Sequence, residues 1–132
     1  MNVKKETQYL EEYDVTVNSY LLPAQIQQIA NAVAKYDTWA EREQNIIMLT
    51  MYHATDVDEK ELEEAGVNAI VESGLFDVVT YHIKNFYAVQ EAIDYNESIG
   101  RNMRLVLKHS GPQINSLLDL VVKHYGKATS KE

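Results

Sequence analysis

Apolar residues recur every three to four positions along most of this 132-residue chain. That spacing places them on one face of an α-helix. The longest such run covers about residues 86–109, with these residues on one side: Phe86, Val89, Ile93, Ile99, Met103 and Val106. The pattern predicts a mainly helical protein, and a chain of this length is enough for one domain with its own core.

Proline, glycine and capping residues divide the helical pattern into segments. Pro23 suits the first position of a helix, and residues Thr38 to Glu41 have the form of a capping box. Gly66 and Gly74 can each adopt the left-handed conformation that ends a helix, and Gly111 followed by Pro112 stops the longest one. The predicted helices cover residues 23–35, 39–52, 58–64, 75–85, 86–109 and 112–124, and residues 67–73 are predicted to form a brief turn of helix.

Two of these helices have unusual faces. The helix after Thr38 is apolar nearly all round, so we expect it to be the most enclosed. In the longest helix, Asn96 and Gly100 interrupt an otherwise apolar seam. An interior glycine costs about 1 kcal/mol relative to alanine, which predicts a close approach there, either by a helix of the same chain or by another subunit. The asparagine can set register, as in coiled coils.

The first twenty residues fall outside the helical pattern. Tyr13, Val15 and Val17 alternate with polar neighbours, which permits one short strand, but a lone strand has no obvious partner. We interpret residues 1–20 as an N-terminal arm, residues 21–126 as the helical domain and residues 127–132 as a polar tail. The predicted fold class is therefore all-α: a compact bundle of five to six helices with an extended N-terminal arm.

Charge is distributed unevenly along the chain. The net charge is −8, which argues against non-specific attraction to nucleic acid or to anionic membranes. Residues 1–100 hold 18 acidic and 6 basic side chains, whereas residues 101–132 hold 6 basic and 2 acidic ones. This asymmetry can steer head-to-tail or partner docking, and the alternative is an acidic surface that keeps the protein soluble. The polar start and the lack of a long apolar run predict no signal peptide and no membrane span.

The motifs of common metal sites and enzymes are missing. Asp56, Asp58 and Lys60 fall at the first, third and fifth positions of an EF-hand loop, but Glu61 replaces its glycine and Val67 its final glutamate. There is no cysteine, so disulfides and thiol chemistry are excluded. No phosphate-binding loop and no nucleophile elbow occurs. We predict no enzyme, no catalytic residue, no metal site and no cofactor.

The histidines lack the spacing of zinc or di-iron ligands. We expect His53 to take a structural role, hydrogen-bonded to Asp56 at a helix end. Nine tyrosines against two phenylalanines suit protein interfaces, although several tyrosines can simply edge the core. Arg101, Arg104 and Lys108 lie on successive turns and are interpreted as partners for acidic groups or for a helix carboxyl end, in preference to a nucleic-acid stripe. The predicted partner-binding residues are Tyr13, Tyr20, Asp58, Glu59, Glu63, Arg101, Arg104 and Lys108.

Four short stretches carry a resemblance to a known class of proteins: Asp37 to Arg42, Ala54 to Asp56, Glu72 to Phe76 and Ile83 to Asn85. Over about residues 20–110 they make the chain similar to small helical proteins encoded among the virion-assembly genes of tailed bacteriophages of Gram-positive bacteria. The resemblance implies a structural or assembly role, such as a head, neck or tail accessory component arranged in a ring. It implies no catalytic residue.

Three hypotheses follow. The first is a non-enzymatic assembly protein of phage type, located in the virion or the host cytoplasm, whose partners are other protein subunits, including copies of itself. The second is a small acidic inhibitor that docks on the basic surface of a host nucleic-acid-binding enzyme, with residues 56–64 resembling a row of phosphate charges. The third is an enzyme whose site has no recognisable motif.

Overall fold

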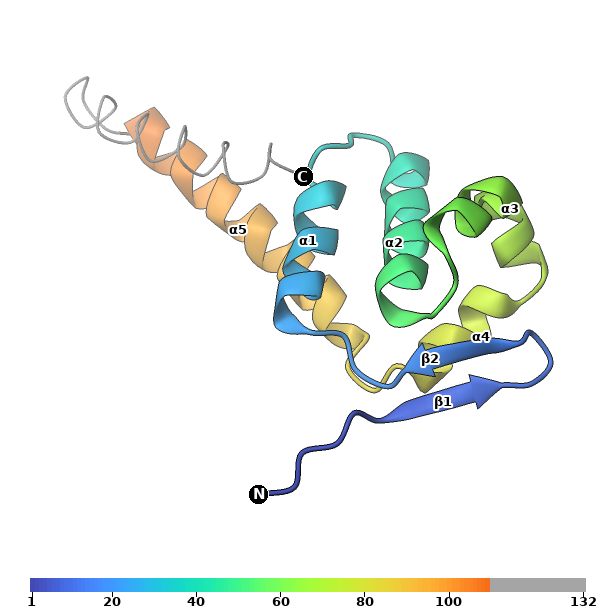
Figure 1. Ribbon diagram of the computed structural model, residues 1–132. Helices are drawn as coiled ribbons and strands as arrows, with labels where there is room; N and C mark the ends of the chain where they lie inside the picture. Colours follow the sequence, from blue (N-terminus) through green and yellow to red (C-terminus); the bar gives the residue numbers. More distant parts are fainter. Residues whose placement is uncertain (110–132) are drawn as a thin grey trace.

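The computed structural model describes residues 1–109 as a mostly helical protein with a small two-stranded sheet (Figure 1). In chain order the elements are β1 (Thr7–Leu10), β2 (Val15–Asn18), α1 (Pro23–Val33), α2 (Trp39–Ala54), α3 (Glu59–Glu72), α4 (Leu75–His82) and α5 (Tyr87–His109). The predicted mainly helical character is confirmed. The helix predicted for residues 112–124 and the polar tail at residues 127–132 lie outside the described residues.

The segment predicted to be an N-terminal arm contains a β-hairpin. β1 and β2 pair antiparallel, with Leu10 opposite Val15 and Thr7 opposite Asn18. On its other edge β2 meets the chain just after α2, where Val17 bridges to Thr55. Because Leu10, Val15 and Val17 are buried in the core, residues 10–21 belong to the folded domain and the arm boundary at residue 20 is wrong. Of the alternating residues, Val15 and Val17 lie in strand β2, which has two neighbours instead of none, and Tyr13 lies in the hairpin turn before it.

Local chemistry explains where α1 and α2 begin. Pro23 is the first residue of α1, and the Gln25 side chain accepts a hydrogen bond of 2.9 Å from the free amide of Leu22. The hydroxyl of Thr38 accepts from the Glu41 amide at 3.2 Å and donates to the Glu41 carboxylate at 2.7 Å. The predicted capping box is thus half formed, since Glu41 bonds the threonine hydroxyl and not its amide.

α2 packs against α1, α3 and α4. Its buried side chains are Ile47, Thr50, Met51 and Ala54. Nevertheless Trp39 is 76% exposed and Tyr52 is 48% exposed. One side of α2 therefore stays open, although this helix, which was expected to be the most enclosed, packs against three others.

Two glycines divide the next stretch of chain. Gly66 has φ 80° and ψ 158°, which breaks α3 internally, and Gly74 has φ 79° and ψ 0° between α3 and α4. Both predicted breaks are confirmed, although only Gly74 has the left-handed helical conformation. α4 ends at His82, three residues before the predicted end, because Ile83 turns to extended backbone.

α5 begins against the core and then leaves it. Val89, Ile93 and Asn96 are buried, and Asn96 donates a hydrogen bond of 3.1 Å to Asn31 of α1. The close approach predicted on this seam is therefore made at Asn96, by a helix of the same chain. At Gly100 a Cβ atom would meet nothing nearer than an Arg104 nitrogen at 3.9 Å, so the expected approach at the glycine is not found within residues 1–109. Beyond that point α5 projects from the body of the molecule (Figure 1).

Candidate interaction surfaces

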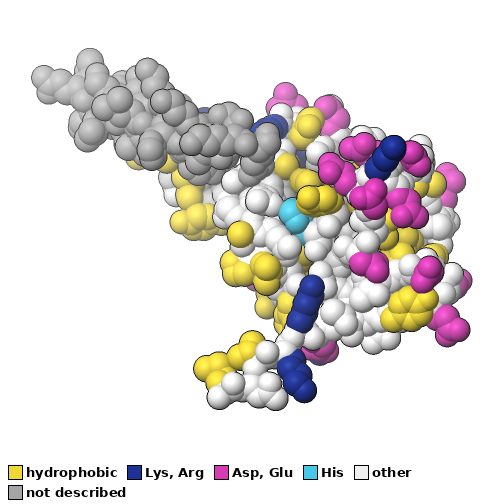
Figure 2. Space-filling view, viewed as in Figure 1, with side chains coloured by type: hydrophobic (Ala, Val, Ile, Leu, Met, Phe, Trp, Pro, Cys, Tyr) yellow, Lys and Arg dark blue, Asp and Glu magenta, His cyan; other side chains and the backbone are white. Residues whose placement is uncertain are grey.

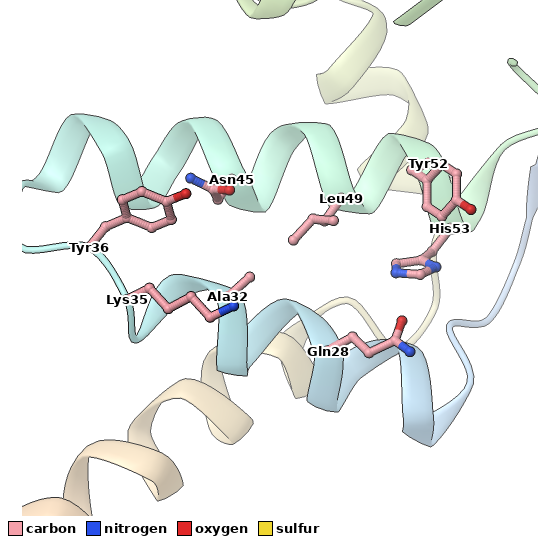
Figure 3. Close-up of a pocket in the computed structure, with 8 residues that line it drawn as sticks. All are labelled: Gln28, Ala32, Lys35, Tyr36, Asn45, Leu49, Tyr52 and His53. Atoms are coloured by element: carbon pink, nitrogen blue, oxygen red, sulfur yellow. The ribbon is translucent and has the colours of Figure 1, made fainter. Parts of the chain in front are cut away.

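A groove of about 430 Å³ runs between α1 and α2 (Figure 3). The groove is lined by residues of α1 and α2 and of the connection between them. α1 contributes Gln28 and Ala32, the connection contributes Lys35 and Tyr36, and α2 contributes Asn45, Leu49, Tyr52 and His53. Ala32 and Leu49 face each other across the groove, and polar or aromatic side chains surround them. A groove with an apolar floor and a polar rim is suited to binding a helix or a peptide.

His53 lies at one end of this groove. Partial burial lowers the pKa of its imidazole below the ordinary value, because the charged form loses hydration. Its ring makes an edge contact with Tyr52, with 5.0 Å between the ring centres. The bond predicted between His53 and Asp56 is not found: the Asp56 carboxylate accepts from the Thr16 amide at 2.9 Å and so fastens the end of α2 to β2. His53 is therefore an uncharged side chain at the edge of the groove at pH 7.

An exposed acidic row lies at the start of α3, on the side of α2 away from α1. We define the acidic row as Asp58, Glu59, Glu61, Glu63 and Glu64, all of them exposed. Acidic side chains gather over α3 in Figure 2, which has the same view as Figure 1. Asp58 occupies the cap position of α3, but its side chain makes no capping hydrogen bond. The predicted partner-binding acids Asp58, Glu59 and Glu63 are thus brought together at the start of α3.

The third surface is the distal segment of α5, which we define as residues 97–106. Leu105 is 54% exposed and Val106 is 42% exposed, while Ile99 and Met103 are half-buried. Arg101 and Arg104 are exposed, and neither forms an ion pair with any residue in the described part of the chain. The side chain of the third predicted base, Lys108, lies outside the described residues. The distal segment therefore combines apolar and basic side chains on one projecting helix.

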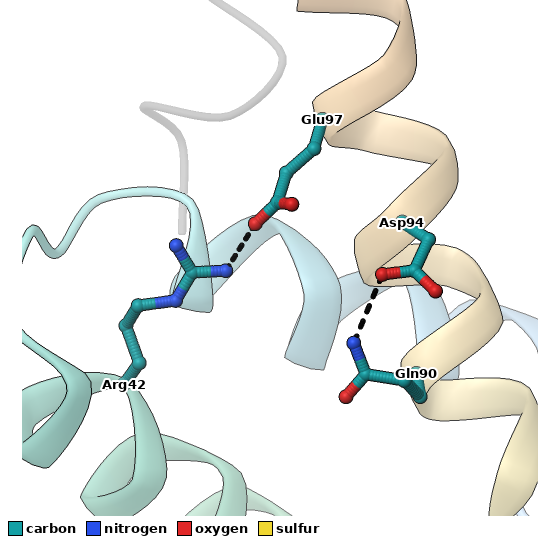
Figure 4. Close-up of polar contacts among 4 residues, drawn as sticks. All are labelled: Arg42, Gln90, Asp94 and Glu97. Carbon is teal, nitrogen blue, oxygen red and sulfur yellow. Dashed lines mark hydrogen bonds and ion pairs between the residues drawn. The ribbon is translucent and has the colours of Figure 1, made fainter.

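Polar contacts hold the base of this projection to the body (Figure 4). Arg42 of α2 forms an ion pair and hydrogen bond with Glu97 of α5, and both side chains are partly exposed. On α5 itself, Gln90 donates to Asp94 at 3.0 Å. The Arg42–Glu97 pair and the Asn31–Asn96 bond therefore join α5 to α2 and α1, whereas the Gln90–Asp94 bond is internal to α5.

No protein-family model, curated protein or solved structure matches this chain. Within residues 1–109 no helix has the length and apolar character needed to cross a membrane. In that same part of the chain, no group of three or more histidine and carboxylate side chains is placed to hold a metal ion.

The two predicted partner-binding tyrosines lie apart from these surfaces. The Tyr13 hydroxyl donates to the backbone oxygen of Ser73 at 2.9 Å, so it joins the hairpin turn to the end of α3. Tyr20 is 49% exposed, and the Lys84 ammonium group lies 5.8 Å from its ring centre. Lys84 in turn forms an ion pair of 2.6 Å with Glu6, and this hydrogen bond raises the Lys84 pKa. Tyr13 has an internal role, whereas Tyr20 keeps an open face.

The groove residues were not predicted as a site. Part of their signal was present, because residues 28 and 32 lie on one face of α1 and residues 45, 49 and 52 lie on one face of α2. The sequence does not show that these two helix faces lie opposite each other, because that depends on how α1 packs against α2. Leu49 looked like an ordinary core residue for the same reason.

Proposed function

We propose that this protein is a non-enzymatic structural or assembly component that makes protein–protein contacts in a larger complex of the phage virion type. The single observation that carries the proposal is the distal segment of α5. The outer turns of α5 project beyond the core, and the side chains of Leu105 and Val106 are exposed there. A projecting stretch of helix of this kind has little stability of its own in water, so its apolar side is suited to packing on another protein.

The resemblance to phage virion-assembly proteins supports the same class of function. In this proposal the helices form a compact bundle, and the exposed residues 1–6 before β1 act as a short extended arm toward a neighbouring subunit. Head, neck and tail accessory components act through repeated contacts between subunits, and such contacts need surfaces in place of a catalytic cleft. The expected location is the virion or the host cytoplasm.

Sizing chromatography with light scattering of the full chain tests this proposal. We expect a defined multimer whose population falls when the apolar contact is removed in Leu105→Glu/Val106→Glu. The matched control is Val71→Glu on α3, whose side chain has a similar exposure of 47% and which we expect to leave the multimer unchanged. A monomer of 15.1 kDa at every concentration and salt level would count against an assembly role.

A second candidate function rests on the acidic row. We propose as the alternative a small acidic inhibitor that covers the basic surface of a host nucleic-acid-binding enzyme, with the row imitating phosphate charges. Reversing Asp58, Glu59 and Glu63 to lysine is expected to abolish capture of such an enzyme from host lysate. Undiminished capture by the reversed variant would refute this alternative, and the exposed triple reversal Glu11→Lys/Glu12→Lys/Glu91→Lys is the control with the same change in net charge.

A further inference from the structure

We propose that the exposed edge of β1 pairs with β1 of a second copy, antiparallel and about a two-fold axis at Gln8, so that the two hairpins form one continuous sheet. The inference rests on the proposed assembly function and names one contact within it, whose partner is a second copy of this chain. Two observations carry it. In the described part of the chain β1 has a strand on one side only, and charges of opposite sign stand at its two ends.

The outer edge of β1 is open. β2 lies between β1 and the body, where the Thr16 amide donates to the Asp56 carboxylate at 2.9 Å and the Thr16 carbonyl accepts from the Asp56 amide at 3.2 Å. Among the described elements β1 packs mainly on β2, and it is the outermost strand in Figure 1. Thr7, Gln8 and Tyr9 are all exposed. An exposed edge strand is a template for pairing with another chain.

The backbone groups of β1 point alternately to β2 and to the open edge. The Ser19 amide donates to the Glu6 carbonyl at 3.0 Å, so these two residues form a hydrogen-bonded pair. Because such pairs alternate along an antiparallel ladder, Gln8 also bonds to β2, while the amides and carbonyls of Thr7 and Tyr9 point outward. The Tyr9 carbonyl accepts a long hydrogen bond of 3.4 Å from the Gln8 side chain. Within residues 1–109 no residue outside the sheet bonds to the other outward groups.

The charges beside β1 fit a second copy in one orientation. Lys4 and Lys5 precede the strand and Glu11 and Glu12 follow it; all four side chains are exposed, and none forms an ion pair with another described residue. The charges are symmetric about Gln8, because Lys5 and Glu11 are each three positions from it and Lys4 and Glu12 each four. Antiparallel pairing about Gln8 therefore brings the lysines of one copy to the glutamates of the other, whereas parallel pairing would bring like charges together.

The same register provides partners for the outward backbone groups. With Gln8 opposite Gln8 of the second copy, Thr7 lies opposite Tyr9 of that copy, and Tyr9 lies opposite its Thr7. Both are hydrogen-bonded pairs, which gives about four hydrogen bonds across the axis. Because the same surface is used by both copies, the contact is isologous and closes as a dimer. Larger assemblies therefore need a second contact, such as the distal segment of α5.

Charge exchange tests this contact in the full-length chain. Lys4→Glu/Lys5→Glu and Glu11→Lys/Glu12→Lys each place like charges at both ends of the paired strands. Each variant alone is expected to associate at least about tenfold more weakly than the wild type in light scattering. An equimolar mixture should recover the dimer, and so should the exchange of all four charges in one chain, which keeps the net charge of −8. Failure of the fourfold exchange to associate would overturn the inference.

Two further variants separate this inference from the proposed function. Glu59→Lys/Glu63→Lys on α3 changes the net charge as the hairpin glutamate reversal does, at exposed positions, and should associate like the wild type. Leu105→Glu/Val106→Glu removes the α5 contact, and we expect a dimer to remain. If the wild type is a multimer and this variant a monomer, the hairpin contact is wrong and the assembly function stands. A wild type that forms only a dimer, unchanged in this variant, supports the hairpin contact and counts against the α5 contact. A wild type that is monomeric throughout refutes both.

Amide hydrogen exchange reports on the paired edge directly. In the dimer the Thr7 and Tyr9 amides are hydrogen-bonded, so they should exchange slowly at high protein concentration and quickly after dilution to the monomer. The Gln8 amide bonds to β2 in both states and is the internal control. Slow exchange of Thr7 and Tyr9 in a sample that is monomeric by light scattering would show that the chain covers its own edge, which would overturn the inference.

Disulfide formation tests the register. Since the chain has no cysteine, Gln8→Cys places one thiol of each copy beside the proposed axis. Opposite residues of a non-hydrogen-bonded pair have Cα atoms about 4.5 Å apart, which is within the range of a disulfide. Oxidation should therefore link Gln8→Cys into a dimer far more completely than Val71→Cys, a control on α3 with an exposure of 47%. Equal yields from the two variants would refute the register.

Discussion

The side chain of Asn85 satisfies both backbone polar groups of Leu21: it accepts from the Leu21 amide and donates to the Leu21 carbonyl, each at 2.9 Å. Leu21 is almost fully buried, and it connects β2 to α1. The backbone amide of Lys84, the residue before Asn85, donates to the backbone carbonyl of Ser19 at 2.7 Å. The connection between α4 and α5 is therefore fastened to the segment that follows the hairpin.

Removal of the Asn85 side-chain amide should destabilise the fold. In Asn85→Ala both Leu21 groups lose their partner, and each unsatisfied buried group costs about 1–3 kcal/mol. We expect the free energy of unfolding in urea to fall by about 2–4 kcal/mol. Asn68→Ala, at an exposed position of α3, should change it by less than about 0.5 kcal/mol. Equal effects of the two substitutions would show that the paired hydrogen bonds contribute little.

Substitution of Thr50 should have the opposite effect and raise the free energy of unfolding. Its side chain is fully buried in α2, and its hydroxyl has no hydrogen-bond partner in the described part of the chain. Valine has nearly the same shape without the polar group, so Thr50→Val should stabilise the fold by about 1 kcal/mol. The check is a rise in the thermal midpoint, with Thr80→Val on the half-buried part of α4 as a comparison. A lower midpoint for Thr50→Val would contradict the prediction.

Alanine substitutions at Gly66 and Gly100 should separate the cost of backbone strain from the cost of steric crowding. A Cβ at Gly66 would meet no atom within 4 Å, yet its φ of 80° with ψ of 158° is a conformation almost restricted to glycine. We expect Gly66→Ala to destabilise by about 1–3 kcal/mol. Gly100→Ala, inside regular helix with its nearest neighbour at 3.9 Å, should instead stabilise by up to about 1 kcal/mol. Chemical denaturation of both variants measures the difference; effects of the same sign would refute the argument.

The lowered pKa of His53 predicts a dependence of stability on pH. In the unfolded chain the imidazole has its ordinary pKa of about 6.5, and burial keeps the folded value below that. As pH falls through 6.5 the unfolded state takes up a proton first, so the free energy of unfolding decreases until the folded value is passed. Above pH 7 the effect is absent. His53→Gln should lose less stability than the wild type between pH 7.5 and 5.5, and an NMR titration midpoint for His53 at or above 6.5 would disprove the premise.

Features that depend on local chemistry were predictable, and those that depend on distant pairing were not. Pro23, Thr38 and Gly74 set element ends through their own backbone or side chain, and each does so in the structure. β1 escaped prediction because three of its four residues are exposed and only Leu10 turns inward, which leaves no alternation to detect. β2 gains its second neighbour from Thr55, 38 positions later, and no local pattern encodes that.

The same difference between local and distant features decides which of the candidate surfaces could be predicted. The acidic row and the arginines of α5 were recognisable from composition, because charges close in sequence stay close on a helix. The groove was not, since Ala32 and Leu49 become neighbours only when two helices pack. Within residues 1–109 no close approach is found at Gly100, because the buried seam of α5 there stops at Asn96, one turn earlier. How far a helix extends past its neighbour is a tertiary property.

Trp39 is the only tryptophan in the chain and stands 76% exposed at the start of α2. Its indole is already in water in the native state, so its fluorescence should shift little in wavelength when the protein unfolds. A blue shift would instead report that something has covered the amino end of α2. The molecule thus contains its own optical probe for association, at a site that needs no label and outside the groove itself.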